Sequence, residues 1–455
     1  MTLALALASA AAIGFGVISL AFGDRATSAF RVVLGLGFGW AISSAVWAAV
    51  LLLGFTSEGA RIGKDAALLT LGAALLWRLP RRRETGAGAP DGSDAPSSPP
   101  DASRLGAPRW LQIAFASASA VAAALVVEHT ARFPDGGWDA WMIWNLRARF
   151  LYRAGPAFRA AFSPDLVFWA HQDYPWLVPG LVAQGFFAAG SESPAIPALV
   201  AVAFAALAVA LLVLTLRELR GPEWGLLGGL VLVSTPCLVA FTANQQSDVP
   251  LGAMLLLGTS TLALALERDD ARLFALAGAG ASMAAWTKNE GALYMLALVA
   301  ALLLHGERRR VGLFLLGAAP IAALFAGFKL FVAHGNDLTR SSDTALARAT
   351  DLHRWAELGL ASLRRLVYFQ NWGLWLLAAI AALWILPRPW RPATRVLLTA
   401  LALCFSVLFP IFILQPHPLL WFFRTAIDRL LIELWPTAIL AVLLSLAPAR
   451  ATART

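Results

Sequence analysis

The chain has 455 residues, of which 59% are hydrophobic and only 14% are charged, and its mean hydropathy is +0.69. Soluble globular proteins carry about 25% charged residues, so the composition excludes a soluble domain and predicts an integral membrane protein. The net charge of +9 is typical of basic cytoplasmic loops in a membrane protein, so it does not indicate nucleic-acid binding.

Continuous apolar runs predict an all-α polytopic membrane protein. A spanning helix needs about 20 mostly apolar residues, and by this length criterion we expect about 13 transmembrane helices. The runs fall near residues 1–22, 28–53, 65–79, 110–128, 194–216, 224–241, 249–266, 271–286, 291–304, 311–333, 373–386, 394–414 and 430–447.

One polar segment divides these runs. Residues 84–108 are rich in Gly, Ser, Pro and Asp, and such a composition predicts a disordered linker, here on the cytoplasmic side. We therefore expect an N-terminal group of three transmembrane helices at 1–83, a catalytic transmembrane module at 109–447 and a cytoplasmic tail at 448–455.

Arginines at the ends of the runs predict the orientation, because short cytoplasmic loops are enriched in Lys and Arg. The outer loops are then 129–192 and 334–372. Residues 176–192 are apolar but short and contain Pro179, so we expect an interfacial or re-entrant helix there, lining a protein cavity. The basic groups assigned to the cytoplasm are Arg78 with Arg81–Arg83, Arg217 with Arg220, Arg268 with Arg272, Arg308–Arg310, and Arg388 with Arg391.

The first outer loop contains an acid among tryptophans, in the sequence GGWDAWMIW. If residues 138–150 form an interfacial helix, Trp138, Trp141 and Asn145 share one face, with Asp139 beside it. A carboxylate there can accept the proton of an attacking hydroxyl as a general base. The alternative is an aromatic belt at the membrane interface with a helix-flanking acid.

The motif HQDYP follows in the same loop. His171 either lies near an anionic group or acts as a metal ligand. The alternative is a simple turn before Pro175, with Asp173 as a local cap.

Two further polar groups interrupt later apolar runs. Asp248, in SDVPLG, is either a helix N-cap with Pro250 in the first turn or a second acid beside Asp139. Lys288 and Glu290 are either a paired polar turn or functional charges at membrane depth, where charges are costly.

Arg424, Asp428 and Arg429 precede the last apolar run. They are either interfacial anchors or include a phosphate-binding arginine, whose planar fork suits that role.

Taken in order, these motifs resemble the integral-membrane GT-C glycosyltransferases over residues 110–447, most closely the protein O-mannosyltransferase and lipid A aminoarabinose transferase branch. The resemblance implies a hexosyl- or pentosyltransferase that moves a sugar from a polyprenyl-phosphate donor to a lipid, glycan or protein acceptor. It also implies an active site at the extracytoplasmic face of the cell (inner) membrane. The matching pieces are Asp139, His171 to Pro175, Asp248, Lys288 to Gly291, and Asp428 with Arg429.

The resemblance also implies roles for individual residues. Asp139 is the catalytic base and Asp248 assists it.

The sequence departs from the family at Ala140, where many members have Glu after the Asp, and in its three extra N-terminal spans. No cofactor is specified, and a divalent metal ion remains open. The substrate-binding candidates are His171, Asp173, Trp138, Trp141, Lys288, Glu290, Arg424 and Arg429.

Two other functions fit the same composition. A transporter or flippase of lipid-linked sugars would have internal repeats and charges near the bilayer midplane. An O-antigen ligase or polymerase would centre on the loop 334–372, with His334, Arg340, His353 and Arg364. Pairing of the two acids in the earlier loops favours the GT-C reading.

Overall fold

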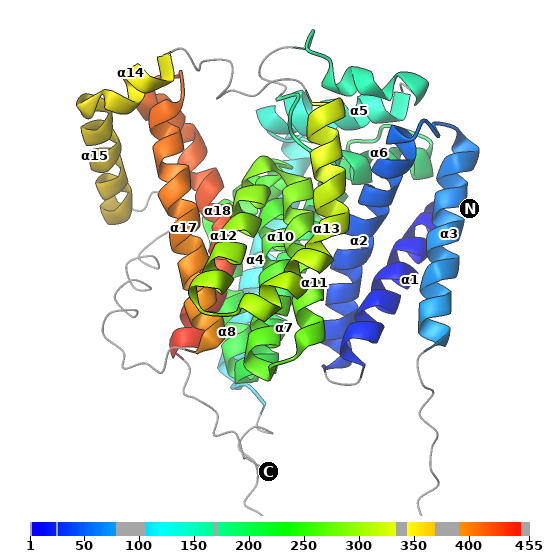
Figure 1. Ribbon diagram of the computed structural model, residues 1–455, viewed down its shortest axis with the longest axis horizontal. Coiled ribbons are helices and arrows are strands. Elements are labelled where there is room, and N and C mark those ends of the chain that lie inside the picture. Colours follow the sequence, from blue (N-terminus) through cyan, green and yellow to red (C-terminus); the bar gives the residue numbers. More distant parts are fainter. Residues whose placement is uncertain are drawn as a thin grey trace, which may run out of the picture.

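The computed structural model describes residues 2–23, 26–78, 106–153, 155–166, 171–333, 344–368 and 391–446. Within these ranges every regular element is a helix, as predicted. Long helices stand side by side, and short helices gather at the upper end of the bundle (Figure 1). The apolar run at 373–386, the tail at 448–455 and all but the last three residues of the linker lie outside the described residues. The short helices are η2 (Ala140–Trp144), α5 (Asn145–Arg153), η3 (Gly155–Phe162), α6 (Leu177–Ala189), α14 (Ala345–Thr350) and α15 (Leu352–Tyr368).

Eight helices of the described residues are long and apolar enough to cross a membrane, or nine if one bent pair counts as a span. The predicted total of about 13 is therefore not confirmed. The eight are α1 (Thr2–Phe22), α2 (Ser28–Leu52), α4 (Arg109–Arg132), α7 (Ala195–Arg220), α10 (Asp248–Arg268), α13 (Arg308–Phe331), α17 (Pro392–Leu414) and α18 (Leu419–Leu446).

The bent pair replaces the single run expected at 224–241. Helix α8 (Pro222–Val233) and helix α9 (Pro236–Ala243) meet at an angle of 60°. Pro236 has no N–H to donate and disfavours helical geometry in the residue before it, so the helix stops and restarts here.

Three predicted spans correspond to helices that are too short or too polar to cross a membrane alone: α3 (Glu58–Trp77), α11 (Ala271–Thr287) and α12 (Asn289–Leu304). Helices α11 and α12 have 17 and 16 residues, which gives each a length of about 25 Å against a hydrocarbon core of about 30 Å. They are separated at Lys288, whose backbone is extended (φ −151°, ψ 161°). The expected polar break is therefore present. It allows the side chain of Lys288 to contact residues on other helices.

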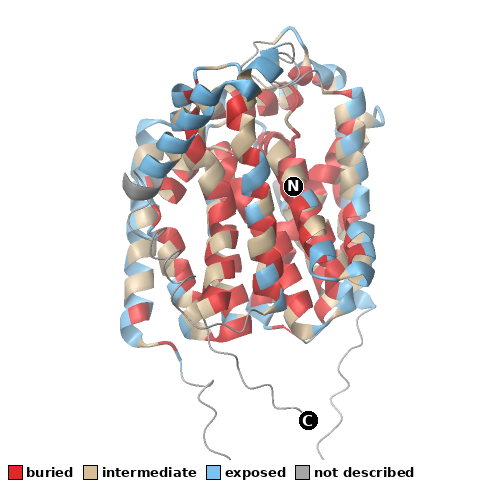
Figure 2. Ribbon diagram, turned by 60° about the vertical axis from the view of Figure 1, so that its left-hand side comes forward, coloured by how far each residue is buried: buried red, intermediate tan, exposed pale blue. Residues whose placement is uncertain are grey.

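Helix α10 is the centre of the molecule. Its entire apolar window is buried inside the protein, and buried residues occupy the middle of the bundle in Figure 2. Helix α11 approaches it closely, because a Cβ on Gly258 would lie 2.7 Å from the backbone nitrogen of Ala281. Small residues permit such close packing of membrane helices. Asp248 is the first residue of α10 and is fully buried.

The N-terminal helices α1, α2 and α3 pack together, and α2 also packs on α6 and α7. A buried polar group joins them to the rest: Nζ of Lys64 lies 2.6 Å from Oδ1 of Asp65 and 2.7 Å from Oε1 of Gln184 on α6. With 13 residues, α6 is only about 20 Å long. It is a short helix at the upper end of the bundle, as expected for the segment around Pro179.

Arginines stand at several helix ends: Arg217 and Arg220 in the last turn of α7, Arg268 at the end of α10 and Arg308 at the start of α13. Two ion pairs there link helix ends, Arg268 with Glu218 at 2.8 Å and Arg391 with Glu267 at 2.9 Å. One strongly basic end is what the positive-inside rule leads us to expect of a cytoplasmic face.

Candidate active site

The last helix begins earlier than the sequence suggested. We expected a span from residue 430, but α18 starts at Leu419, so Arg424, Asp428 and Arg429 lie inside the helix and do not precede it. The apolar criterion failed because charged residues are tolerated in a membrane helix that turns them toward the protein interior. Arg429 and Glu433, one turn apart, share that inner face.

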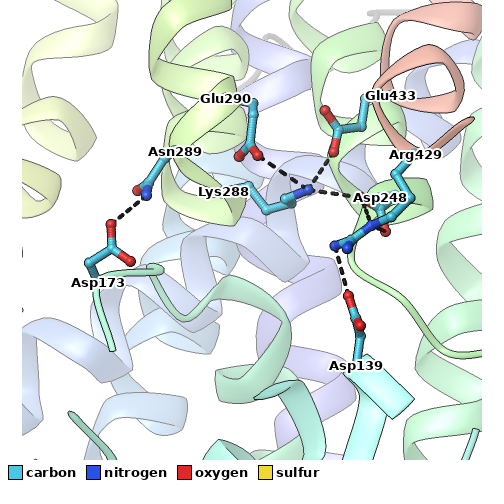
Figure 3. A network of polar contacts seen from close by, with 8 residues as sticks. All are labelled: Asp139, Asp173, Asp248, Lys288, Asn289, Glu290, Arg429 and Glu433. Carbon is cyan, nitrogen blue, oxygen red and sulfur yellow. Dashed lines mark hydrogen bonds and ion pairs between the residues drawn. The ribbon is translucent and has the colours of Figure 1, made fainter. Parts of the chain in front are cut away.

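Lys288 is the centre of a buried charge cluster drawn in Figure 3. Its Nζ donates to Oδ1 of Asp248 at 2.8 Å and makes a short hydrogen bond to Glu433. Glu290 lies 3.6 Å away, and the lysine side chain is only 2% exposed. Because a buried charge without a partner is strongly destabilising, these contacts tie the α11–α12 break to the start of α10 and to α18.

Arg429 extends the cluster to the first outer loop. Its Nε lies 3.3 Å from Oδ2 of Asp248, and its Nη2 lies 2.8 Å from Oδ2 of Asp139 in an ion pair that lacks hydrogen-bond geometry. The two predicted catalytic acids therefore share one arginine (Figure 3). Burial raises the pKa of Asp139 above its ordinary value, although the charge of Arg429 opposes this.

The helix that follows Asp139 is not the regular one we expected. Residues Ala140–Trp144 form a π turn, which is wider than an α turn. The predicted proximity of the two tryptophans is nonetheless present, because the rings of Trp138 and Trp141 pack edge to face with centroids 6.1 Å apart. The two tryptophans are 45% and 44% exposed. Asn145 is buried and donates to Oε1 of Gln245 at 2.9 Å.

Arg147 holds the HQDYP loop. Its Nη2 donates to the carbonyl of His171 at 2.8 Å and its Nη1 to that of Tyr174 at 3.3 Å. Burial lowers the pKa of Arg147 to about 10 and that of His171 to about 4. At neutral pH the arginine is therefore charged and the imidazole neutral.

Asp173 is more than a local cap. It accepts a hydrogen bond from Nδ2 of Asn289 at 2.7 Å and lies 3.2 Å from Nζ of Lys329. Because Asn289 follows Lys288 directly, this contact joins the HQDYP loop to the charge cluster.

Aromatic contacts strengthen the same connection. The rings of Trp144 and Tyr174 are stacked, with centroids 5.3 Å apart, and Nζ of Lys288 lies 5.8 Å from the Tyr174 ring. Stacking and cation–π contacts of this kind add to packing. Loop and cluster thus form one connected site.

The remaining candidates lie at its edge or away from it. Arg424 is exposed and is not part of the cluster formed by the described residues. In the later loop, His353 is 80% exposed and lies 3.6 Å from Glu357 on its own helix. His334 and Arg340 lie outside the described residues.

Sequence reasoning missed several members of the site. Glu433 and Lys329 could have been found, since each is a single charge within an apolar run, and such charges are functional candidates. Asn289 and Arg147 offered no comparable signal. In the described part of the chain, no three His, Cys, Asp or Glu side chains are grouped so that they could hold a metal ion.

A groove of about 550 Å³ opens beside the Asp139 loop, between α4 and the bent pair α8–α9. Its walls are mostly apolar, and only 11% of the apolar window of α4 is buried inside the protein. At its polar end, Nε2 of His129 lies 2.9 Å from Oδ1 of Asn244, whose carbonyl accepts a hydrogen bond from the N–H of Gly137. Through Asn244, the groove residue His129 is therefore connected to Gly137, two residues before Asp139.

In a comparison with known proteins, residues 174–332 match the family model described as dolichyl-phosphate-mannose-protein mannosyltransferase. The match contains Asp248, Lys288 and Glu290 but not Asp139 or Arg429. No curated protein and no solved structure matched the chain. The match confirms the resemblance to the GT-C families over this segment.

Proposed function

We propose that the protein transfers a sugar from a polyprenyl-phosphate carrier to a hydroxyl-bearing acceptor at the extracytoplasmic face of the cell membrane. Asp139 is the general base, and Asp248 holds the cationic groups in place. The observation that carries the proposal is the convergence of Asp139 and Asp248 on Arg429. The family match supplies the reaction class.

The reaction needs one proton acceptor and one stabiliser of negative charge. The acceptor hydroxyl gives its proton to the carboxylate of Asp139 while its oxygen forms a bond to the anomeric carbon of the sugar. The bond between that carbon and the phosphate oxygen breaks, and its electron pair leaves with the polyprenyl phosphate. The charge that develops on the phosphate is stabilised by a fixed cation.

Arg429 is suited to be that cation. A guanidinium carries five N–H donors, and its ion pairs to Asp139 and Asp248 involve only Nε and Nη2. Its side chain is 23% exposed, so part of the planar fork is accessible to a phosphate. Lys288 is almost fully buried and acts through Asp248, which it holds beside Arg429.

The groove between α4 and α8–α9 is suited to the polyprenyl chain. A chain lying there would stay in contact with the bilayer through the exposed side of α4. Its phosphate end would lie at His129 and Asn244, next to the loop that carries Asp139.

The test is transfer of radiolabelled sugar from a polyprenyl-phosphate donor to membrane extracts by the purified full-length protein. Asp139→Asn should lower turnover at least about 100-fold, since general base catalysis contributes about 10²–10⁴. The matched control is Asp135→Asn, in the same loop but exposed and paired with Arg149, which should retain activity. Wild-type turnover by a well-folded Asp139→Asn protein would refute the assignment. Translocation of donor without transfer would favour a flippase instead.

A further inference from the structure

A second pocket lies between the N-terminal helices and the outer helices of the catalytic module. Its volume is about 180 Å³. Drug-sized ligands occupy pockets of about 300–1,000 Å³, so this one suits a smaller molecule. It is lined by Trp47, Leu51, Phe55, Thr56, Ser57, Glu58, Arg61, Leu151, Tyr152, Gly155 and Phe187.

Arg61 is the chemically informative residue of the pocket. Its side chain is 91% buried, it lies over the Phe187 ring at 4.7 Å, and it donates to Oε1 of Glu58 at 3.2 Å. Its Nε is buried and has no hydrogen-bond partner within the described residues. This buried arginine therefore forms part of the pocket wall and brings a guanidinium charge to it.

The charge of the lining selects the kind of ligand. Arg61 is balanced by Glu58, so an anion would meet a carboxylate as well as a guanidinium. A neutral polyol can instead donate to Glu58 and accept from Arg61 and from the hydroxyls of Thr56 and Ser57. Trp47, Tyr152 and Phe187 supply flat apolar walls, which suit the apolar face of a sugar ring.

The position of the pocket connects it to the catalytic cluster. Tyr152 lies near the C-terminal end of α5, and Trp144, which stacks on Tyr174, directly precedes α5. The eight residue steps from one to the other correspond to about 12 Å along the helix. A ligand in the pocket would therefore be offset from the reacting hydroxyl by a distance that an oligosaccharide can cover.

We propose that this pocket binds one sugar ring of a glycan acceptor, at a distance from the ring that receives the new sugar. The inference rests on the proposed function only in describing the bound glycan as an acceptor. Binding of a neutral saccharide does not depend on the proposed function. Most of the lining comes from α2, α3 and the segment between them, outside the matched residues 174–332. The extra N-terminal helices would thus supply the acceptor specificity of this particular chain.

The experiment measures saccharide binding by the purified full-length protein in nanodiscs, without donor. The probes are a panel of neutral methyl pyranosides and short oligosaccharides, with inorganic phosphate as the anionic comparison. We expect saturable binding of at least one saccharide, weakened about tenfold in each of two pocket variants. These are Arg61→Lys, which keeps the charge but not the fork, and Glu58→Gln, which removes the carboxylate acceptor. Arg159→Lys, an exposed arginine outside the pocket, should bind as the wild type does.

Three results would overturn the proposal. One is binding of phosphate but of no saccharide. Another is saccharide affinity unchanged in both pocket variants. The third is affinity lost in Asp139→Asn but not in the pocket variants, which would put the sugar at the charge cluster. Because no turnover is involved, failure here leaves the proposed transfer reaction standing. If transfer is active, Arg61→Lys should raise the KM of the acceptor about tenfold and leave kcat unchanged.

Discussion

Arg429 of the last helix and Asp139 of the first large loop form an ion pair of 2.8 Å between Nη2 and Oδ2. The same guanidinium also contacts Asp248. One cation therefore links the proposed base, the second acid and the site suited to the donor phosphate, so its removal should affect donor binding first.

Arg429→Lys is expected to weaken donor binding by about ten- to a hundredfold, since hydrogen bonds to charged groups contribute about 1.5–3 kcal/mol. A lysine keeps the charge but loses the planar fork. The measurement is the donor KM, with the acceptor KM determined in parallel. Arg153→Lys, at an exposed arginine paired with Glu192, is the control. An acceptor KM that rises more than the donor KM would contradict a phosphate role for Arg429.

The pH dependence of the reaction should report Asp139. Burial raises the pKa of this carboxyl above its ordinary value, against the opposing charge of Arg429. A base works only when deprotonated, so kcat/KM should increase as pH rises through a pKa above the usual value of about 3.9. The measurement is kcat/KM from about pH 4 to pH 8. The decrease of kcat/KM toward low pH is the acid limb of this profile.

His171 is the competing explanation for such a limb, but burial lowers its pKa to about 4. His171→Gln should therefore leave the limb in place, whereas Asp139→Glu should move it. A limb that disappears in His171→Gln and is unmoved in Asp139→Glu would assign the titration to the histidine.

The sequence predicted helices well where apolar runs were long and free of charge. The run at 28–53 corresponds to Ser28–Leu52 and the run at 311–333 to Arg308–Phe331, because length and hydropathy alone decide such segments. It failed for α18, where Arg429 and Glu433 interrupt the apolar pattern but face inward. It also failed at the π turn after Asp139, which has no distinct composition.

The candidate site was predicted residue by residue but not as a set of contacts. Asp139, Asp248, Lys288 and Arg429 were all named as candidates, yet nothing in their spacing along the chain specifies that Lys288 joins Asp248 to Glu433. Those contacts depend on which helices are neighbours in the bundle. Pairing of helices is a tertiary property that hydropathy does not encode.

The buried polar group of the N-terminal helices should stabilise their packing. Asp65 is only 4% exposed, and its Oδ1 lies 2.6 Å from Nζ of Lys64. The substitution Lys64→Met leaves this buried carboxylate without its cation. Removing one partner of a buried ion pair costs about 3–5 kcal/mol, whereas replacing both by apolar residues is often neutral. We expect a clear loss of thermal stability for Lys64→Met and recovery in the double variant Lys64→Met with Asp65→Leu, measured by thermal denaturation in detergent. Equal stability of all three proteins would mean that the pair contributes nothing.

The orientation of the active site can be tested with an impermeant thiol reagent. Asp248 is 0% exposed, so a cysteine there would not react from either side, and exposed neighbours are the better probes. Both native cysteines, Cys237 and Cys404, are buried, which keeps the background low. A cysteine at Ala160, in η3 beside the site, should be labelled in intact cells. One at Arg309, at the basic end, should be labelled only after the membrane is permeabilised. The reverse pattern would place the charge cluster on the cytoplasmic side and exclude an extracytoplasmic reaction.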